Sequence, residues 1–221
     1  MTANKRPFYI VFEGLEGVGK TTQVQKLVDY LQSKGKRVLQ TKEPGTSYLP
    51  LTMELRKLML DSQYDSQQTV LSRELISQAI RSIHMEKLVY PALKSGEYDF
   101  IIQDRGILSG FAYGIACGNK FSLIESITNT MIADDYGYEY LYDLVIYLTG
   151  NVSEGLERAS HKKEFEEGDA MEKKGATFLE TVGEKMECCS QYFSTRYIDI
   201  NGKNIEQVFA EIKKMIEVCF M

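Results

Sequence analysis

The stretch FYIVFEGLEGVGKT at residues 8–21 decides the fold class of this chain. Its first five residues form a short, nearly continuous apolar run, which predicts a strand buried on both faces, as in a parallel sheet. Residues 14–21 satisfy the pattern G-x-x-x-x-G-K-[ST] between that strand and a helix, which is the setting that a phosphate-binding loop requires. The helix is predicted from Thr21 to a stop at Gly35 by apolar residues at i, i+3, i+4 and i+7. These residues are Val24, Leu27, Val28 and Leu31.

Four further apolar runs lie at residues 38–41, 100–102, 144–148 and 197–200, with helical-period stretches between them. Strands that alternate with helices favour an α/β fold with a doubly wound, five-stranded parallel sheet. A last amphipathic helix is predicted from Ile205. Residues 158–185 are dense in Lys and Glu and are interrupted by glycines, which indicates a mobile charged lid. We expect one domain over residues 1–221, with the lid at about 158–185.

The composition narrows the possible functions. Of the 221 residues, 43% are hydrophobic and 26% are charged, which excludes disordered and collagen-like classes. The 26 Lys and Arg residues against 31 Asp and Glu give a net charge of −5, without the positive field that attracts nucleic acid or an anionic membrane. No apolar run approaches the roughly 18 residues of a membrane span. We therefore expect a cytoplasmic protein that binds neither nucleic acid nor membrane.

The glycine-rich loop predicts a site for the phosphates of a nucleotide. Glycines let the backbone curl so that several N–H groups point at one anion, and the following helix adds the positive end of its dipole. Lys20 would reach the β- and γ-phosphates, and the hydroxyl of Thr21 would bind Mg²⁺, a hard cation that prefers oxygen ligands. The alternative is a tight glycine turn that holds no ligand.

A second chemical feature follows the run at residues 100–102. There Asp104 places a carboxylate at the end of a predicted strand, where acidic residues contact a metal or an incoming substrate. Such an Asp also occurs as a turn or helix cap. The adjacent Arg105 favours the functional interpretation, because its fork of donors suits a second phosphate at the same edge of the sheet.

Several segments, taken in order, resemble the thymidylate kinase family, which moves a phosphoryl group from ATP to dTMP. They are FEGLEGVGKTT at 12–22, TKEPG at 41–45, AIRSIH at 79–84, DRGILSGFAY at 104–113 and LERA at 156–159. The first segment is shared with many nucleotide enzymes, whereas the combination is fairly specific. The resemblance spans nearly the whole chain and implies the P-loop NTPase fold, ATP as phosphoryl donor, Mg²⁺, a nucleoside monophosphate acceptor and a homodimer.

Residue roles follow from the resemblance by position. It implies a donor-binding set of Gly14, Glu16, Gly17, Gly19, Lys20, Thr21 and Thr22. The implied acceptor-binding set is Glu16, which would face the sugar 3′-hydroxyl, with Glu43, Arg81, Arg105, Ser109 and Tyr113. Thr21 and Asp104 would hold the metal. The implied catalytic set is Lys20, Asp104, Arg105, Arg158 and Lys162, of which the last two belong to the lid. The acidic Glu16 beside Gly17 places the chain nearer the bacterial-type subgroup.

The sequence departs from the family pattern at three places. The lid segment D-R-[IF]-E is Asp-Ala-Met-Glu at residues 169–172, so its arginine is missing. Ser77 stands where the family stacks a Phe on the thymine ring, four residues before Arg81. Gly106 follows Arg105 in place of Tyr or His. The small Ser77 predicts a pocket that accepts a broader set of monophosphates.

Other functions stay open from the residues alone. The first is a kinase for another deoxynucleotide or for a broader set of them. A GTP-binding switch should carry an N-K-x-D motif, but the segment that begins at Asn119 lacks its Asp. An inactive scaffold is the third possibility. His84 has no catalytic partner near it in the sequence and is expected to be structural, and the tyrosines of residues 136–142 are expected to serve packing or subunit contact.

Overall fold

The computed structural model describes residues 6–132, 141–160 and 169–219, apart from the side chains of 159, 160 and 219. Its centre is one sheet of five strands in the order β2-β3-β1-β4-β5, and every neighbouring pair is parallel. This confirms the predicted doubly wound α/β fold. The strands are β1 (Phe8–Glu13), β2 (Val38–Lys42), β3 (Phe100–Asp104), β4 (Leu144–Thr149) and β5 (Thr195–Asp199).

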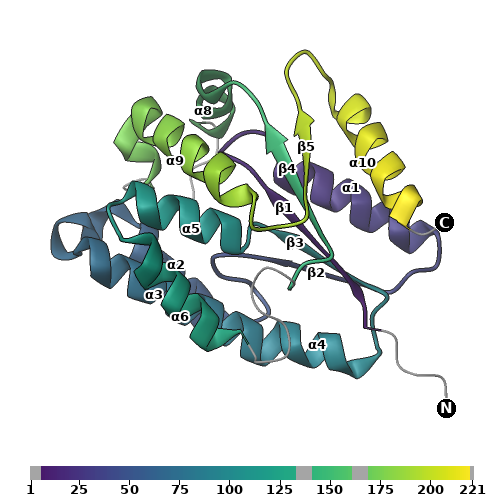
Figure 1. Cartoon of the computed structure of the whole chain (residues 1–221), viewed down its shortest axis with the longest axis horizontal. Helices are drawn as coiled ribbons and strands as arrows, with labels where there is room; N and C mark the ends of the chain where they lie inside the picture. Colours follow the sequence, from purple (N-terminus) through teal and green to yellow (C-terminus); the bar gives the residue numbers. More distant parts are fainter. Residues whose placement is uncertain (1–5, 133–140, 161–168, 220–221) are drawn as a thin grey trace.

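Helices cover both faces of the sheet (Figure 1). The helices α1 and α10 pack together on one face, while α5 and α9 pack together on the other, near α2, α3, α4 and α6 (Figure 1). The helices are α1 (Lys20–Ser33), α2 (Pro50–Leu60), α3 (Val70–His84), α4 (Tyr90–Ser95), α5 (Ile107–Ala116), α6 (Phe121–Met131), α8 (Val152–Ser160), α9 (Gly175–Ser190) and α10 (Ile205–Cys219). Among the described residues, no helix combines the length and the hydrophobicity needed to cross a bilayer.

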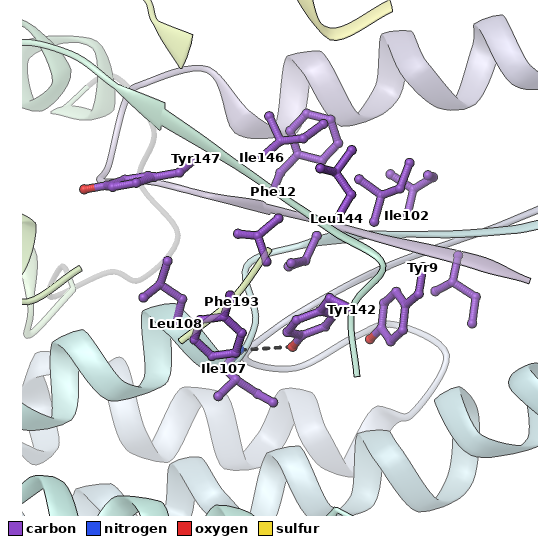
Figure 2. Packing of buried hydrophobic residues seen from close by; sticks show 14 of the residues in the cluster. Tyr9, Phe12, Ile102, Ile107, Leu108, Tyr142, Leu144, Ile146, Tyr147 and Phe193 are labelled. Atoms are coloured by element: carbon purple, nitrogen blue, oxygen red, sulfur yellow. Dashed lines mark hydrogen bonds between the residues drawn. The ribbon is translucent and has the colours of Figure 1, made fainter. Parts of the chain in front are cut away.

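The central strand β1 is buried on both faces, as its apolar run predicts. Its residues from Tyr9 to Phe12 are fully buried, because helices cover the two sides to which alternate side chains point. Figure 2 shows the core around this strand. There the rings of Tyr9 and Tyr142 pack edge to face with their centroids 4.9 Å apart. The Tyr142 hydroxyl accepts a hydrogen bond from the backbone N–H of Ile107 at 3.1 Å, shown as the dashed line (Figure 2). That bond ties the start of α5 to the core.

The order of the strands determines where a site can form. From β1 the chain leads to β2 and β3 on one side and to β4 and β5 on the other, so β1 lies at the topological switch point. Ligands bind in such sheets beyond the carboxyl ends of the strands at this point. The register pairs Phe12 with Asp104, so the phosphate loop that follows β1 and the carboxylate that ends β3 are adjacent.

The expectation of one mobile lid over residues 158–185 is wrong for its second half. Residues from Gly175 onward form the regular helix α9, which packs against α5. Leu179, Val182 and Met186 lie one to two turns apart and are buried, which is the helical periodicity that the dense charges of this segment obscured. Residues 161–168, which include Lys162, lie outside the described part of the chain.

The packing of α9 predicts a large effect of a core truncation there. Leu179→Ala should lower the free energy of unfolding by about 2–5 kcal/mol, because it leaves a cavity against α5. The exposed neighbour provides the control, and Glu180→Ala should change the value by less than about 0.5 kcal/mol. Urea unfolding of both variants measures the difference. Equal stability of the two variants would show that this segment is not part of the core.

Candidate active site

The phosphate loop joins β1 to α1 in a conformation that depends on glycine. Gly19 caps the helix with φ of 90°, in the left-handed region that favours glycine. Gly17 has φ of 70°, and a Cβ there would lie 1.9 Å from the backbone oxygen of Gly155 in α8. Helix α8 therefore approaches the loop as closely as two glycines allow. Its Arg158 donates from Nε to the Gly17 carbonyl at 2.9 Å.

Lys20 is the first residue of α1 and lies beneath the loop. Its side chain is buried, and Nζ donates to the Leu15 carbonyl at 2.5 Å. Burial and the neighbouring Arg105 lower the pKa of Lys20 to about 8, although Glu16 and Asp104 act in the opposite direction. The loop pattern predicts an anionic ligand, and the negative charge of that ligand would favour the charged form of the Lys20 ammonium.

The structure brings Thr21 and Asp104 together from separate parts of the chain. The Thr21 hydroxyl donates to Asp104 Oδ2 at 2.6 Å. A hydroxyl and a carboxylate oxygen beside a phosphate loop are the donor types that suit Mg²⁺, which binds through one or two protein oxygens together with substrate phosphates. The predicted metal ligands are therefore adjacent, and their chemistry fits the ion.

Arg105 links the loop to the neighbouring pocket. Its Nη1 donates to the Gly14 carbonyl at 2.9 Å and to the Ser109 hydroxyl at 3.1 Å, and its Nη2 donates to Glu16 Oε1 at 2.8 Å. Arg105 is the one non-glycine residue with positive φ, 63°, among those described, and this conformation carries the side chain back across the loop. Burial alone would raise the pKa of the Glu16 carboxyl, but Arg105 and Lys20 outweigh it and lower that pKa to about 2.

Glu13 is a buried site residue that the motifs did not single out. Its carboxylate accepts from the N–H of Gly106 at 2.9 Å and of Ser109 at 3.2 Å, and also from the Ser109 hydroxyl. These bonds hold the turn after Arg105 and the first turn of α5, whose N–H groups otherwise lack partners. Burial raises the pKa of the Glu13 carboxyl, and Ser109 opposes that rise. The sequence signal that could have identified Glu13 is its position as a carboxylate at the end of a buried apolar strand.

A buried group of charged residues lies under the pocket. Glu43 accepts from Arg81 Nε at 3.0 Å through one oxygen and contacts His84 Nδ1 at 3.0 Å through the other. The second ring nitrogen of His84 is 2.8 Å from the Thr41 hydroxyl. Burial would raise the pKa of Glu43, but Arg81 and His84 lower it to about 2. His84 is therefore structural, as expected, with a carboxylate partner that lies 41 residues away in the sequence.

One pocket lies between α3, α5 and the phosphate loop. All six expected acceptor-binding residues line it: Glu16, Glu43, Arg81, Arg105, Ser109 and Tyr113. Ser77 lines it as well, as do apolar side chains that include Met59, Leu60 and Met171. Asp169, at the start of the altered lid motif, also faces it. Burial raises the pKa of the Asp169 carboxyl.

The Glu43 group predicts a pH-dependent stability. The folded pKa of Glu43 is about 2, below its usual value of 4.5, so its stabilising effect is full above about pH 4.5 and is lost as pH falls toward 2. Glu43→Gln should cost about 3 kcal/mol at pH 7, because it leaves the Arg81 charge buried without its partner. The difference from wild type should be about 2 kcal/mol smaller at pH 3. Urea unfolding at both pH values measures it, and a difference that does not change with pH would contradict the assignment.

Comparisons with known proteins identify the family to which the chain is similar. The family model described as "Thymidylate kinase" matches residues 12–212. A thymidylate kinase of Thermosipho africanus is 33% identical over 95% of this chain and 97% of its own length, and one of Halothermothrix orenii is 30% identical over 98% and 99%. The crystal structure of thymidylate kinase from Ehrlichia chaffeensis shares the fold with a TM-score of 0.70 at 24% identity, covering 96% of this chain and 99% of that one. The chain belongs to the thymidylate kinase family.

Proposed function

We propose that this protein transfers the γ-phosphoryl group of ATP to dTMP and produces dTDP for DNA precursor synthesis. The observation that carries the proposal is the position of Arg105, whose guanidinium contacts both the donor loop at Gly14 and the pocket residues Glu16 and Ser109. An acceptor phosphate bound in the pocket would therefore lie beside the donor phosphates. Phosphoryl transfer depends mainly on such positioning and on neutralisation of charge.

On the donor side, the loop of residues 14–21 holds the ATP phosphates through backbone N–H groups, with Lys20 placed at the β- and γ-phosphates. The Lys20 ammonium donates to the Leu15 carbonyl and has two further N–H donors for these phosphates, and burial lowers its pKa to about 8. Thr21 and Asp104 would hold Mg²⁺. The ion, when bound, would neutralise part of the negative charge of the phosphates.

On the acceptor side, Arg105 and Arg81 bind the monophosphate while Glu16 faces the sugar. A guanidinium fork suits phosphate oxygens. Glu43 holds the side chain of Arg81, and Glu13 holds the backbone turn at Gly106 that follows Arg105. Arg158 lies against Gly17 of the loop, where its guanidinium can add positive charge near the transferred group. Lys162 is assigned the same role from the family resemblance. The substrates of this reaction favour the cytoplasm as its location.

The test is an assay of the purified protein with Mg²⁺-ATP and each of dTMP, dUMP, dCMP and dGMP, scored for diphosphate formation. We expect dTDP from dTMP at the highest kcat/KM. Ser77 favours a second candidate, a kinase for a broader set of monophosphates, because an aromatic stack worth about 1–3 kcal/mol is absent at that position. Similar kcat/KM values for several bases would support that candidate, and no diphosphate from any of them would contradict both.

Lys20→Met should lower kcat by at least about a hundredfold, because the transferred phosphoryl group loses a buried positive charge. Lys20 is buried, so the fold has to be checked separately, and the far-ultraviolet circular dichroism and thermal midpoint should remain close to wild type. Lys26→Met in the same helix is the control and should keep wild-type kcat. A Lys20→Met protein that is as active as the control would show that the donor site is wrongly assigned.

We also propose that the protein is a homodimer, with α2 and α3 at the interface. These helices pack against each other, yet large apolar side chains on both are about half exposed. They are Leu51 and Leu58 on α2, and Val70, Leu71 and Leu75 on α3. A solvent-exposed apolar face of this kind is typical of a surface that a second subunit covers.

The dimer proposal predicts a change in mass. The double variant Leu71→Glu and Leu75→Glu should sediment as a monomer near 25 kDa, because it places two charges in the interface. Val218→Glu, at an exposed position of α10, should sediment like wild type at twice that mass. Analytical ultracentrifugation distinguishes the two. A monomeric wild type would remove the proposal.

A further inference from the structure

The pocket contains a buried carboxylate for which the proposed reaction has no use. Glu74 lies on α3, seven residues before Arg81, and its side chain lines the same pocket. Only 5% of the residue is exposed. Seven residues rise about 10 Å along a helix, so Glu74 lies far from the end of the pocket that meets the phosphate loop. Ser77 lies between Glu74 and Arg81 on the same face of α3, and its small side chain leaves the approach to Glu74 open.

The opposite wall of the pocket is shaped to accommodate this carboxylate. On α5, Gly114 faces Glu74, and a Cβ at that position would lie 2.5 Å from Glu74 Oε2. One turn earlier Gly110 faces Arg81, where a Cβ would lie 2.3 Å from Nη2. Any larger side chain at either glycine would displace the charged group opposite it. Two glycines therefore give α3 room to present Arg81 and Glu74 along one pocket.

The two oxygens of Glu74 differ in their hydrogen bonds. Oε1 accepts a hydrogen bond of 2.6 Å from Gln78 Nε2, and Gln78 in turn accepts from Arg81 Nη1 at 3.2 Å. Within the described part of the chain, Oε2 has only a long contact of 3.4 Å with Asn119 Nδ2, although a carboxylate oxygen can accept about two hydrogen bonds. Gly114 and Asn119, which flank Oε2, both line the pocket. One acceptor therefore remains available to a ligand.

We propose that Glu74 reads the base of the acceptor nucleotide, with Oε2 accepting a hydrogen bond from the imide N3–H of thymine. This inference rests on the proposed function and extends it to base recognition. A hydrogen bond at the edge of the base would then supply the selectivity that a stacked aromatic ring at position 77 would otherwise supply.

The arrangement favours a single ring N–H over other base edges. Gln78 already bonds to Oε1, so guanine would have to share that oxygen with Gln78 to place its paired N1–H and N2–H groups on the carboxylate, whereas a single ring N–H needs only Oε2. The unprotonated N3 of cytosine is an acceptor and would face Oε2 without a proton between them. Beside the N3–H of thymine lie two carbonyl oxygens, and the Asn119 amide, which already points at Oε2, can donate to one of them. Burial raises the pKa of the Glu74 carboxyl, so a donor from the substrate replaces solvation that the pocket does not supply.

The test compares dTMP with N3-methyl-dTMP, which lacks the proton, for wild type, Glu74→Ala and Glu74→Gln. Wild type should prefer dTMP by at least about a hundredfold in kcat/KM. Glu74→Ala should lower kcat/KM for dTMP about ten- to a hundredfold. It should also bring the ratio between the two substrates close to one, because alanine neither accepts a hydrogen bond from N3–H nor excludes the methyl group. Glu74→Gln keeps the shape of the side chain and should give an intermediate ratio. Glu54→Gln, an exposed loss of the same charge on α2, should leave the ratio unchanged.

The ratio separates base reading from a structural role. If both substrates lose activity equally in the Glu74 variants, Glu74 only supports the pocket and the inference is overturned. A wild type that uses N3-methyl-dTMP as well as dTMP overturns it without any variant, so a failure of Glu74→Ala to fold does not protect it. These results leave the proposed kinase activity intact, whereas a wild type that makes no dTDP overturns the kinase activity and the inference together.

Discussion

The guanidinium of Arg105 is the contact on which the site depends. It joins the carbonyl of Gly14 in the phosphate loop to Glu16 and Ser109 in the pocket, so in the proposed function one rigid group would set the positions of donor and acceptor. That geometry requires a left-handed backbone at a residue with a side chain, which costs on the order of 1–3 kcal/mol. Glu13 offsets this cost by holding the N–H groups of Gly106 and Ser109 immediately after the turn.

A second buried network supports the acceptor side and runs along α3. From His84 through Glu43, Arg81 and Gln78 to Glu74, each side chain bonds to the next. Buried polar groups are costly when a partner is missing, so the network holds its members in one arrangement. The same order that fixes Arg81 near the phosphate end holds Glu74 at the other end of the pocket. Positioning for catalysis and recognition of the base thus share one structural support.

Much of the fold was predictable from local patterns. The apolar runs located all five strands. The signal is strongest for β1, β3 and β4, because strands buried on both faces carry almost no polar residues, whereas the edge strands β2 and β5 are partly exposed and carry several. The loop pattern located the proposed donor site. The charged stretch from residue 158 led to the wrong prediction of a mobile lid up to residue 185, since the buried positions of α9 are outnumbered by its solvated ones. Glu13, Glu43 with His84, and Glu74 acquire their roles only through partners distant in the sequence, and a single sequence does not show such pairs. Family motifs pointed to Glu43 as a ligand, whereas its contacts show that it also holds Arg81 and His84.

The measurement that tests the account most directly is the steady-state kinetics of Arg105→Lys with dTMP and ATP varied in turn. Lysine keeps the charge but loses the fork that reaches Gly14, Glu16 and Ser109 together. The account predicts that the KM for dTMP rises and kcat falls, with kcat/KM for dTMP lower by about a hundredfold, because a misplacement of about 1 Å has an effect of that size. The KM for ATP should change by less than about threefold, since the loop backbone and Lys20 hold the donor. An equal loss of affinity for both substrates, or wild-type kinetics for both, would contradict the central role of Arg105.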